Sequence, residues 1–191
     1  MSNISKLLHS NEKILWQGKP VFKSFILAGY NIALFFFGLV FVAFSLSFFF
    51  LSGQALGGAP FPFNVFPLIF LFVGFAIAFG APISSVFAYG NTEYAITNQR
   101  LIIQTGALGL KTRFIDFEKI QEVNVKVGLL DRVFGTGGIY ADTASSIRGW
   151  TQYSGRGTYN VNRPDLIALK EPYKVNKILQ QAMEDLKSST D

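Results

Sequence analysis

The sequence has no cysteine and a single histidine, His9. Without cysteine there are no disulfide bonds, no thiolate metal ligands and no cysteine nucleophile. One imidazole alone does not make a histidine-rich metal site. The HExxH motif of zinc hydrolases is missing, and the Gly-rich stretch at residues 135–138 is not followed by the Lys-Ser/Thr pair of a phosphate-binding loop. We therefore expect no enzymatic activity, no cofactor and no bound metal.

The sequence is also poor in charge, since only 15% of its residues are charged, whereas about a quarter is usual for a soluble domain. The deficit is local, because residues 24–92 contain no Asp, Glu, Lys, Arg or His. A soluble core of this size would still need a charged surface. The stretch, which is dominated by Phe, is therefore predicted to face lipid.

Two apolar runs predict a transmembrane helical hairpin over residues 25–88, with spans at about residues 25–51 and 65–86. Residues 52–64 are rich in Gly and Pro and predict the turn between the spans. A cleaved signal peptide is not expected, because the first run is too long and a second run follows it. Neither span carries an ionisable residue of the kind that marks a transport path.

The basic residues nearest to the hairpin predict its orientation. Residues 52–64 contain no Lys or Arg, whereas Lys19 and Lys23 precede the first span and Arg100, Lys111 and Arg113 follow the second. The positive-inside rule therefore predicts a multi-pass protein of the inner (cytoplasmic) cell membrane, with both termini in the cytoplasm. The five residues are also candidate contacts for anionic lipid headgroups.

Residues 89–191 are predicted to form a mainly β cytoplasmic domain. Alternation of apolar and polar residues predicts strands at residues 93–96, 100–104, 111–117, 120–127, 139–143 and 166–169. Pro172 then begins an amphipathic helix whose apolar side includes Val175, Leu179 and Ala182. This order predicts a bent antiparallel sheet or barrel that is capped by a C-terminal helix.

Several motifs in this domain resemble the bacterial and archaeal pleckstrin-homology-like (bacterial PH domain) family of two-span membrane proteins. The residues that carry the resemblance are Tyr94, Ile96, Thr97, Asn98, Arg100 and Leu101, then Gly106, then Ile120, Val123 and Val125, then Phe134, Gly135, Thr136 and Gly137, with Pro172, Tyr173 and Val175 at the last helix. The resemblance implies a seven-stranded bent sheet with a C-terminal helix and no known catalytic activity. It also implies that residues 1–24 join the domain through an opening strand at residues 12–18.

Two interpretations of Arg100 stay open at this point. Its guanidinium group either holds turn carbonyls or a carboxylate, or it contacts a ligand or lipid. The turn at residues 97–100 offers one Arg, whereas phosphoinositide-binding pleckstrin-homology domains carry several basic residues in their first strands and the loop between them. A specific phosphoinositide site is therefore not supported.

Residues 144–162 are Gly-rich and predict a long hairpin or loop whose pairing stays open. This segment carries Arg148, Trp150, Tyr153 and Arg156, and residues of these types are frequent anchors of protein interfaces. Two alternatives remain for it, a contact patch for a protein partner and a loop that folds back on its own sheet.

The function that fits these observations is a non-catalytic, membrane-anchored binding or scaffold module for a protein partner or for its own copies. The alternative is a subunit of an oligomeric channel or transporter. That alternative rests on the two spans and on small residues in the second, Gly74, Ala76, Ala78 and Gly80. The net charge is +5, and the sequence lacks the basic cluster that is typical of a nucleic-acid-binding protein. An enzyme, with one acid or base among Asp116, Glu118 and Asp131, ranks third.

Overall fold

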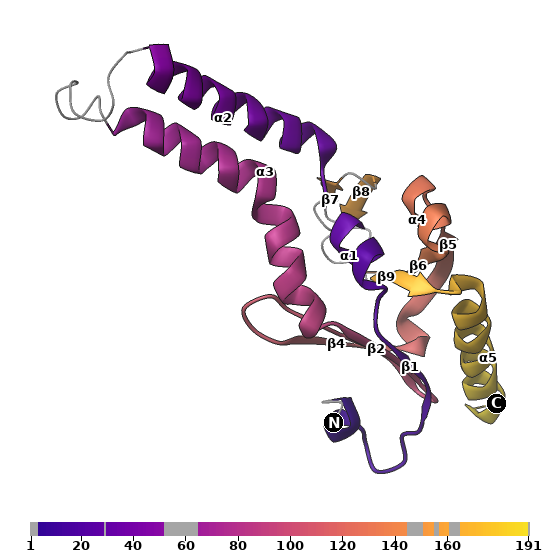
Figure 1. The fold of residues 1–191 in the computed structure, drawn as a ribbon. Helices are drawn as coiled ribbons and strands as arrows, with labels where there is room; N and C mark the ends of the chain where they lie inside the picture. The colour runs from indigo at the N-terminus through magenta and orange to yellow at the C-terminus, as the bar shows by residue number, and fades with distance from the viewer. Residues whose placement is uncertain are drawn as a thin grey trace.

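The structure is a computed structural model and describes residues 4–28, 30–51, 65–144, 151–154, 157–160 and 165–190. Two long helices run side by side away from a body of short strands, and the C-terminal helix lies against that body (Figure 1). The chain contributes one strand to the body before the long helices and returns to it after them. The helical hairpin is therefore an insertion within the β domain.

The first sheet has four antiparallel strands in the order β1-β2-β3-β4. They are β1 (Ile14–Gly18), β2 (Glu93–Thr97), β3 (Arg100–Thr105) and β4 (Lys111–Asp116). The last three confirm the strands predicted from alternation to within one residue. β1 pairs with β2 from Ile14 opposite Thr97 to Gly18 opposite Tyr94, so the segment before the hairpin completes this sheet.

The second sheet has three antiparallel strands in the order β5-β6-β9. They are β5 (Ile120–Lys126), β6 (Thr136–Thr143) and β9 (Asp165–Lys170), and a short helix, α4 (Leu129–Phe134), joins β5 to β6. β6 begins three residues earlier than predicted, because Gly135 alone ends α4 in the left-handed conformation (φ 61°). Between β6 and β9, β7 (Thr151–Ser154) pairs with β8 (Gly157–Asn160) as a separate hairpin.

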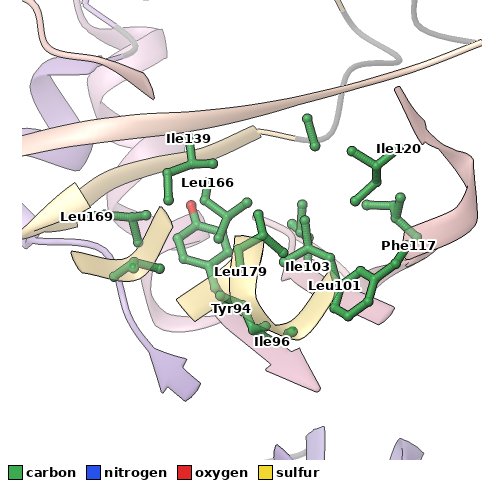
Figure 2. Packing of buried hydrophobic residues seen from close by; sticks show 14 residues of the cluster. Tyr94, Ile96, Leu101, Ile103, Phe117, Ile120, Ile139, Leu166, Leu169 and Leu179 are labelled. Carbon is green, nitrogen blue, oxygen red and sulfur yellow. The ribbon is translucent and has the colours of Figure 1, made fainter. Parts of the chain in front are cut away.

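The C-terminal helix α5 (Pro172–Thr190) packs on both sheets and closes the core. Tyr94, Leu101, Ile139, Leu166 and Leu179 come from both sheets and from α5, and each is at most 1% exposed (Figure 2). Seven strands in two sheets with this helix give the pleckstrin-homology-like fold that the resemblance implied. The predicted fold class is therefore confirmed.

The alternative of a closed barrel is wrong for the part of the chain that the structure describes. On one side, the amide of Val21 donates a hydrogen bond to the carbonyl of Ala168 (2.7 Å), which joins the segment after β1 to β9. On the other side, β4 and β5 are the outer strands of their sheets. They are connected by a single 3₁₀ turn, η2 (Phe117–Lys119), and do not pair with each other.

The first apolar run forms two helices rather than one, α1 (Phe22–Ala28) and α2 (Ile32–Leu51). The prediction of a continuous span from residue 25 is therefore wrong at its start. Ser24 and Phe25 of α1 are buried, and α1 packs against β9 and α4. Asn31 begins α2, because its side-chain oxygen accepts hydrogen bonds from the amides of Ala33 (3.0 Å) and Leu34 (3.2 Å).

The second long helix, α3 (Phe66–Gly90), extends four residues beyond the predicted end at residue 86. Pro82 lies inside it, and Figure 1 shows α3 changing direction part-way along its length. A proline inside a helix removes one backbone hydrogen bond and bends the axis. After the bend, α3 continues almost to β2, which begins at Glu93.

The helices α2 and α3 meet at glycines. A Cβ atom on Gly38 would lie 2.6 Å from the carbonyl oxygen of Gly74 and 2.7 Å from the nitrogen of Ala78, so this contact requires a residue without a side chain. A Cβ atom on Gly80 would meet nothing within 4 Å. Of the small residues in α3, Gly74 and Ala78 therefore serve packing within the hairpin.

A buried polar cluster joins the base of the hairpin to the second sheet. The carboxylate of Asp131 accepts hydrogen bonds from the Gly128 amide (3.0 Å), the Thr136 hydroxyl (2.9 Å) and, more weakly, the Ser24 hydroxyl (3.4 Å). The hydroxyls of Ser24 and Thr136 are also in contact at 2.8 Å. Asp131 thus caps α4 and holds α1 against it, which is a structural role.

Candidate functional site

A groove lies between the outer strand β5 and the C-terminal half of α5. It consists of two adjoining hollows, with volumes of about 380 and 560 Å³, which share Ile120, Met183 and Glu184. The floor is apolar, since Ile120 is buried and Val123, Met183 and Leu186 are half-buried. The groove lies at the corner where the chain passes from one sheet to the other.

The strand beside this groove has an unpaired edge. β5 pairs with β6 along one edge, and no strand among the described residues pairs along the other. Gln121, Glu122 and Val123 of β5 line the groove opposite Gln180, Met183 and Glu184 of α5. The unpaired amides and carbonyls of an outer strand offer hydrogen bonds to an added strand. The groove can therefore accept an extended polypeptide.

The rim of the groove is mainly acidic. Glu118, Glu122 and Glu184 line it and are exposed, and Lys187 is the basic residue at one end. Complementary charge selects partners and speeds their encounter more than it adds affinity. The apolar floor and acidic rim together suit a segment in which apolar and basic side chains alternate.

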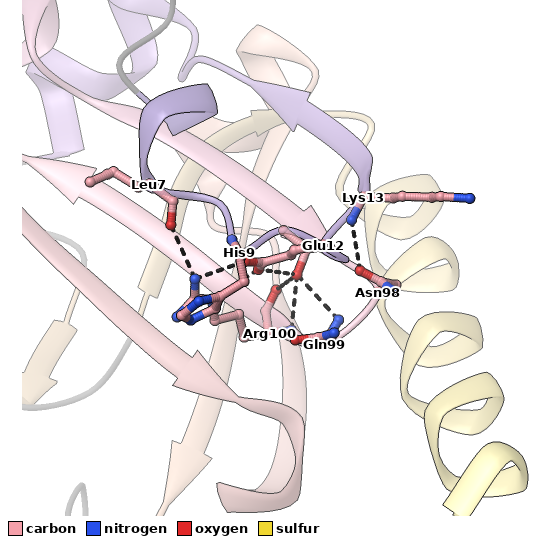
Figure 3. A network of polar contacts seen from close by, with 8 residues as sticks. Leu7, His9, Glu12, Lys13, Asn98, Gln99 and Arg100 are labelled. Carbon is pink, nitrogen blue, oxygen red and sulfur yellow. Dashed lines mark hydrogen bonds and ion pairs between the residues drawn. The ribbon is translucent and has the colours of Figure 1, made fainter.

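At the opposite end of β3 from the hairpin, Arg100 forms a buried ion pair with Glu12 (Figure 3). Its Nε donates to Oε1 of Glu12 at 2.9 Å, and its Nη2 donates to Oε2 at 2.7 Å and to the Leu7 carbonyl at 3.2 Å. The side chain of Glu12 is 0% exposed and that of Arg100 is 12% exposed. This is the carboxylate-and-carbonyl role that the sequence left open for Arg100.

The carboxylate of Glu12 accepts two further hydrogen bonds, from the Thr97 hydroxyl (2.8 Å) and from the His9 amide (3.0 Å). Burial alone would raise the pKa of Glu12. The hydrogen bonds from Arg100, His9 and Thr97 and the charge of Arg100 outweigh burial, so the pKa of Glu12 lies below its ordinary value. Glu12 is therefore a charged, fully bonded anchor for the N-terminal segment.

The Thr-Asn-x-Arg motif forms the turn that receives this segment. The Thr97 hydroxyl oxygen accepts hydrogen bonds from the amides of Gln99 (3.2 Å) and Arg100 (3.0 Å). The Asn98 side-chain oxygen accepts a hydrogen bond from the backbone amide of Lys13 at 2.9 Å, and the backbone amide of Asn98 donates one to the Lys13 carbonyl at 3.1 Å. The motif thus holds the chain immediately before β1.

Three of the five basic residues that the sequence suggested as lipid contacts lie at one end of the first sheet. Lys19 and Lys23 are exposed where the chain leaves β1 for the hairpin, and Lys111 is exposed at the start of β4, at the same end of the sheet. Arg113 is half-buried on β4. Arg100 lies at the other end of the sheet, in its bonds to Glu12.

The aromatic and basic patch predicted in the Gly-rich segment falls largely outside the described residues. Tyr153 belongs to β7, of which only the backbone is described, and Arg148, Trp150 and Arg156 lie outside the described ranges. A partner contact at these residues stays a prediction.

The groove itself was not expected from the sequence. The helical spacing predicts an apolar face that includes Val175, Leu179 and Ala182, and none of these three residues lines the groove. The available signal was that β5 alternates cleanly, as strands with one solvated face do. That signal does not say which edge of the strand is left unpaired, because pairing depends on tertiary arrangement.

Comparison with known proteins places this fold in a family. The family model for the bacterial PH domain matches residues 24–183. The chain belongs to the bacterial PH domain family. A search of the curated proteins finds no match. Among solved structures, the chain is similar to a DUF1696 family protein with a pleckstrin-homology domain from Shewanella loihica PV-4, at 11% identity and a TM-score of 0.31, over 48% of this chain and 71% of that one.

The family confirms the resemblance that the motifs carried, and PH-like domains are generally non-catalytic binding modules. In the ranges that the structure describes, no group of three or more His, Asp or Glu side chains is placed to hold a metal ion. Of the candidate acids, Asp116 pairs with Lys119 on the surface at 2.5 Å, and Asp131 is committed to the buried cluster with Thr136.

Proposed function

We propose that the chain is a non-catalytic, membrane-anchored binding module that holds an extended segment of a protein partner in the groove between β5 and α5. The observation that carries the proposal is the unpaired edge of β5 beside an apolar floor with an acidic rim. Main-chain hydrogen bonds along β5 would supply affinity, and the side chains in the groove would supply selectivity.

Membrane anchoring is supported by the surfaces of α2 and α3. In the two candidate spans, Ile32–Phe50 and Phe66–Gly90, only 11% and 17% of the most apolar stretch is buried within the chain. Phe36, Phe50 and Phe72 are 61%, 75% and 74% exposed, and apolar surface on this scale supports contact with lipid. Helices of 19 and 25 residues are about 29 and 38 Å long, enough for a hydrocarbon core of about 30 Å.

The polar side chains within the hairpin also suit a lipid environment. The Ser45 hydroxyl donates to the Pro67 carbonyl across the two helices, and the hydroxyls of Ser84 and Ser85 donate to the Ala81 carbonyl at 2.8 and 3.0 Å. Internal hydrogen bonds of this kind are what a polar group requires inside a bilayer. The basic residues that flank the hairpin favour a cytoplasmic location for the domain, at the inner face of the membrane.

The alternative of a channel or transporter subunit gains no support from the packing. The small residues that suggested helix association, Gly74 and Ala78, contact Gly38 of the same hairpin. We therefore assign the hairpin the role of an anchor and the domain the role of recognition.

The experiment uses the full chain in nanodiscs and two synthetic ten-residue peptides, one alternating Val and Lys and one alternating Val and Glu. The Val/Lys peptide is expected to bind, as measured by fluorescence anisotropy, and the Val/Glu peptide is not. Glu184→Lys is expected to weaken binding by about three- to tenfold at low salt, because it replaces attraction with repulsion at the rim. Asp185→Lys is the matched control, since Asp185 is exposed on the same helix but does not line the groove.

A second measurement locates the contact. A photo-crosslinking amino acid at Gln180, which lines the groove, is expected to capture the Val/Lys peptide, whereas the same group at the exposed neighbour Gln181 is not. Equal capture at both positions, or equal weakening by the two charge reversals, would contradict the groove as the binding site.

A further inference from the structure

The turn between β3 and β4 exposes two leucines. Leu108 is 102% exposed, the highest value of any large hydrophobic residue that the structure describes, and Leu110 is 56% exposed. Lys111 follows them directly, and residues 106–110 contain no charged residue. Exposing these apolar side chains to water is unfavourable, so the free energy falls when an apolar surface covers the loop tip.

Sheet topology places this turn at the end of the domain where the hairpin begins. Gly18 at the end of β1 pairs with Tyr94 near the start of β2, and Thr105 at the end of β3 pairs with Lys111 at the start of β4. Neighbouring strands run in opposite directions, so these four strand ends lie together at one end of the sheet. The hairpin connects β1 to β2 at the same end of the sheet at which the turn connects β3 to β4.

The turn is also fixed to the hairpin. Asn91, at the C-terminus of α3, donates its side-chain amide to the carbonyl of Gly106 at 3.0 Å. A Cβ atom on Gly106 would lie 1.6 Å from the carbonyl oxygen of Gly109, so the turn is a tight one that requires glycine. Figure 1 shows the turn beside the C-terminal end of α3.

We propose that Leu108 and Leu110 insert into the membrane at the boundary between headgroups and acyl chains, with Lys111 at the anionic headgroups. The proposal rests on the membrane anchoring proposed above and goes beyond it, because it gives the domain a second contact with the bilayer. The position of the turn beside α3 is the reason that the occupant is lipid rather than protein. Two contacts, the hairpin and this turn, fix how the domain is oriented on the membrane, and hence where the groove faces.

The experiment uses the absence of native cysteine. Leu108→Cys, Gln99→Cys and Phe72→Cys variants are each labelled with a bimane dye and reconstituted into phosphatidylcholine/phosphatidylglycerol vesicles. Gln99 is the control in the turn at the opposite end of the sheet, immediately before β3, and lies about 20 Å from the end of β3 at about 3.3 Å per residue. Phe72 is exposed near the middle of the long hairpin and reports anchoring on its own.

Nitroxide groups on the acyl chains are expected to quench the dye on Phe72→Cys and on Leu108→Cys. The dye on Leu108→Cys should be quenched at least about threefold more than the dye on Gln99→Cys, because we expect it to lie within about 10 Å of the boundary. Aqueous iodide is expected to quench Gln99→Cys more than Leu108→Cys. Adding Lys111→Glu to Leu108→Cys should reduce nitroxide quenching in anionic vesicles and leave it unchanged in neutral ones.

Quenching at Phe72→Cys with no more quenching at Leu108→Cys than at Gln99→Cys overturns the loop contact and leaves the anchoring intact. That pattern is also the one expected if the leucines dock on a protein. If neither Phe72→Cys nor Leu108→Cys is quenched by the nitroxides, the anchoring fails and the loop contact fails with it.

Discussion

Removing the guanidinium group of Arg100 should detach the N-terminal segment from the sheet. In Arg100→Met the carboxylate of Glu12 keeps its hydrogen bonds from Thr97 and His9 but loses its counter-ion, in a position where the Glu12 side chain is 0% exposed. Breaking a buried ion pair by removing one partner costs about 3–5 kcal/mol, because an uncompensated charge remains in the interior. We expect a loss of this size in the stability of the β1–β2 pairing.

The loss should depend on pH in a definite direction. Because the pKa of Glu12 in the folded wild type lies below its ordinary value of 4.5, the stability that it contributes is present above about pH 4.5 and disappears as the pH falls through the folded pKa. In Arg100→Met, the hydrogen bonds and charge of Arg100 no longer lower the pKa of Glu12, so burial favours the protonated carboxyl group. The difference between the two proteins should therefore be greatest at neutral pH and shrink in acid, and in Glu12→Gln this pH dependence should be absent.

Trp16 on β1 gives the assay, because it packs against the main core and senses whether β1 is docked. With Trp150 replaced by Phe, Trp16 is the single tryptophan, and its emission during urea unfolding in nanodiscs reports this strand. The double variant Glu12→Leu/Arg100→Met is the control and should recover most of the loss, because a buried pair replaced by apolar groups is often neutral. Single variants that each cost less than about 1 kcal/mol and add independently would refute the reasoning.

Three further substitutions test the packing, each by thermal unfolding in detergent. Gly38→Leu should destabilise the hairpin by about 1–3 kcal/mol or more through overpacking, whereas Gly80→Leu, where a Cβ meets nothing within 4 Å, should be close to neutral; equal effects would contradict the packing. Thr136→Val should cost about 1–3 kcal/mol, because a buried carboxylate loses a donor, and an unchanged melting temperature would argue against that. Gly106→Ala should lower stability by more than about 1 kcal/mol, whereas Gly109→Ala, which has free space, serves as its control and should not.

Local periodicity was enough to predict most strands of the domain and its C-terminal helix. Val123 and Val125 lie on one face of β5 and pack against the core, as the alternation indicated. Val175, Leu179 and Ala182 are buried on α5 at the predicted helical spacing. These elements follow from burial of one face, which leaves a regular pattern in the sequence.

The break between α1 and α2 could not be read from hydropathy, because both sides of it are apolar. Phe25 has the hydrophobicity of a residue in a membrane span, but it is buried by contacts within the domain and is only 8% exposed. The polar signals were Ser24, which bonds to the buried Asp131 cluster, and Asn31, which caps α2. Neither signal identifies its partner, since Asp131 lies more than a hundred residues from Ser24 in the chain.

The partner of Arg100 and the groove could not be predicted from the sequence for a related reason. The Thr-Asn-x-Arg motif and its family resemblance identified Arg100, yet its partner Glu12 lies 88 residues earlier and on the other side of the hairpin. The groove depends on which strands stay unpaired, as with β4 and β5, and this is a property of the assembled sheets. Sequence patterns state which face of a strand is apolar but not which edge lacks a neighbour.

The pairing of β1 with β2 also sets an order of assembly during synthesis. Gly18 is made first and must wait until Tyr94 has emerged, so the sheet cannot be completed before the whole hairpin exists. An unstructured connection of this length would carry a large closure entropy, and the paired helices α2 and α3 remove it by bringing their two ends together. Once β2 has been made, β1 covers the edge of β2 that β3 leaves free, and the Glu12–Arg100 pair holds the segment before β1 in place.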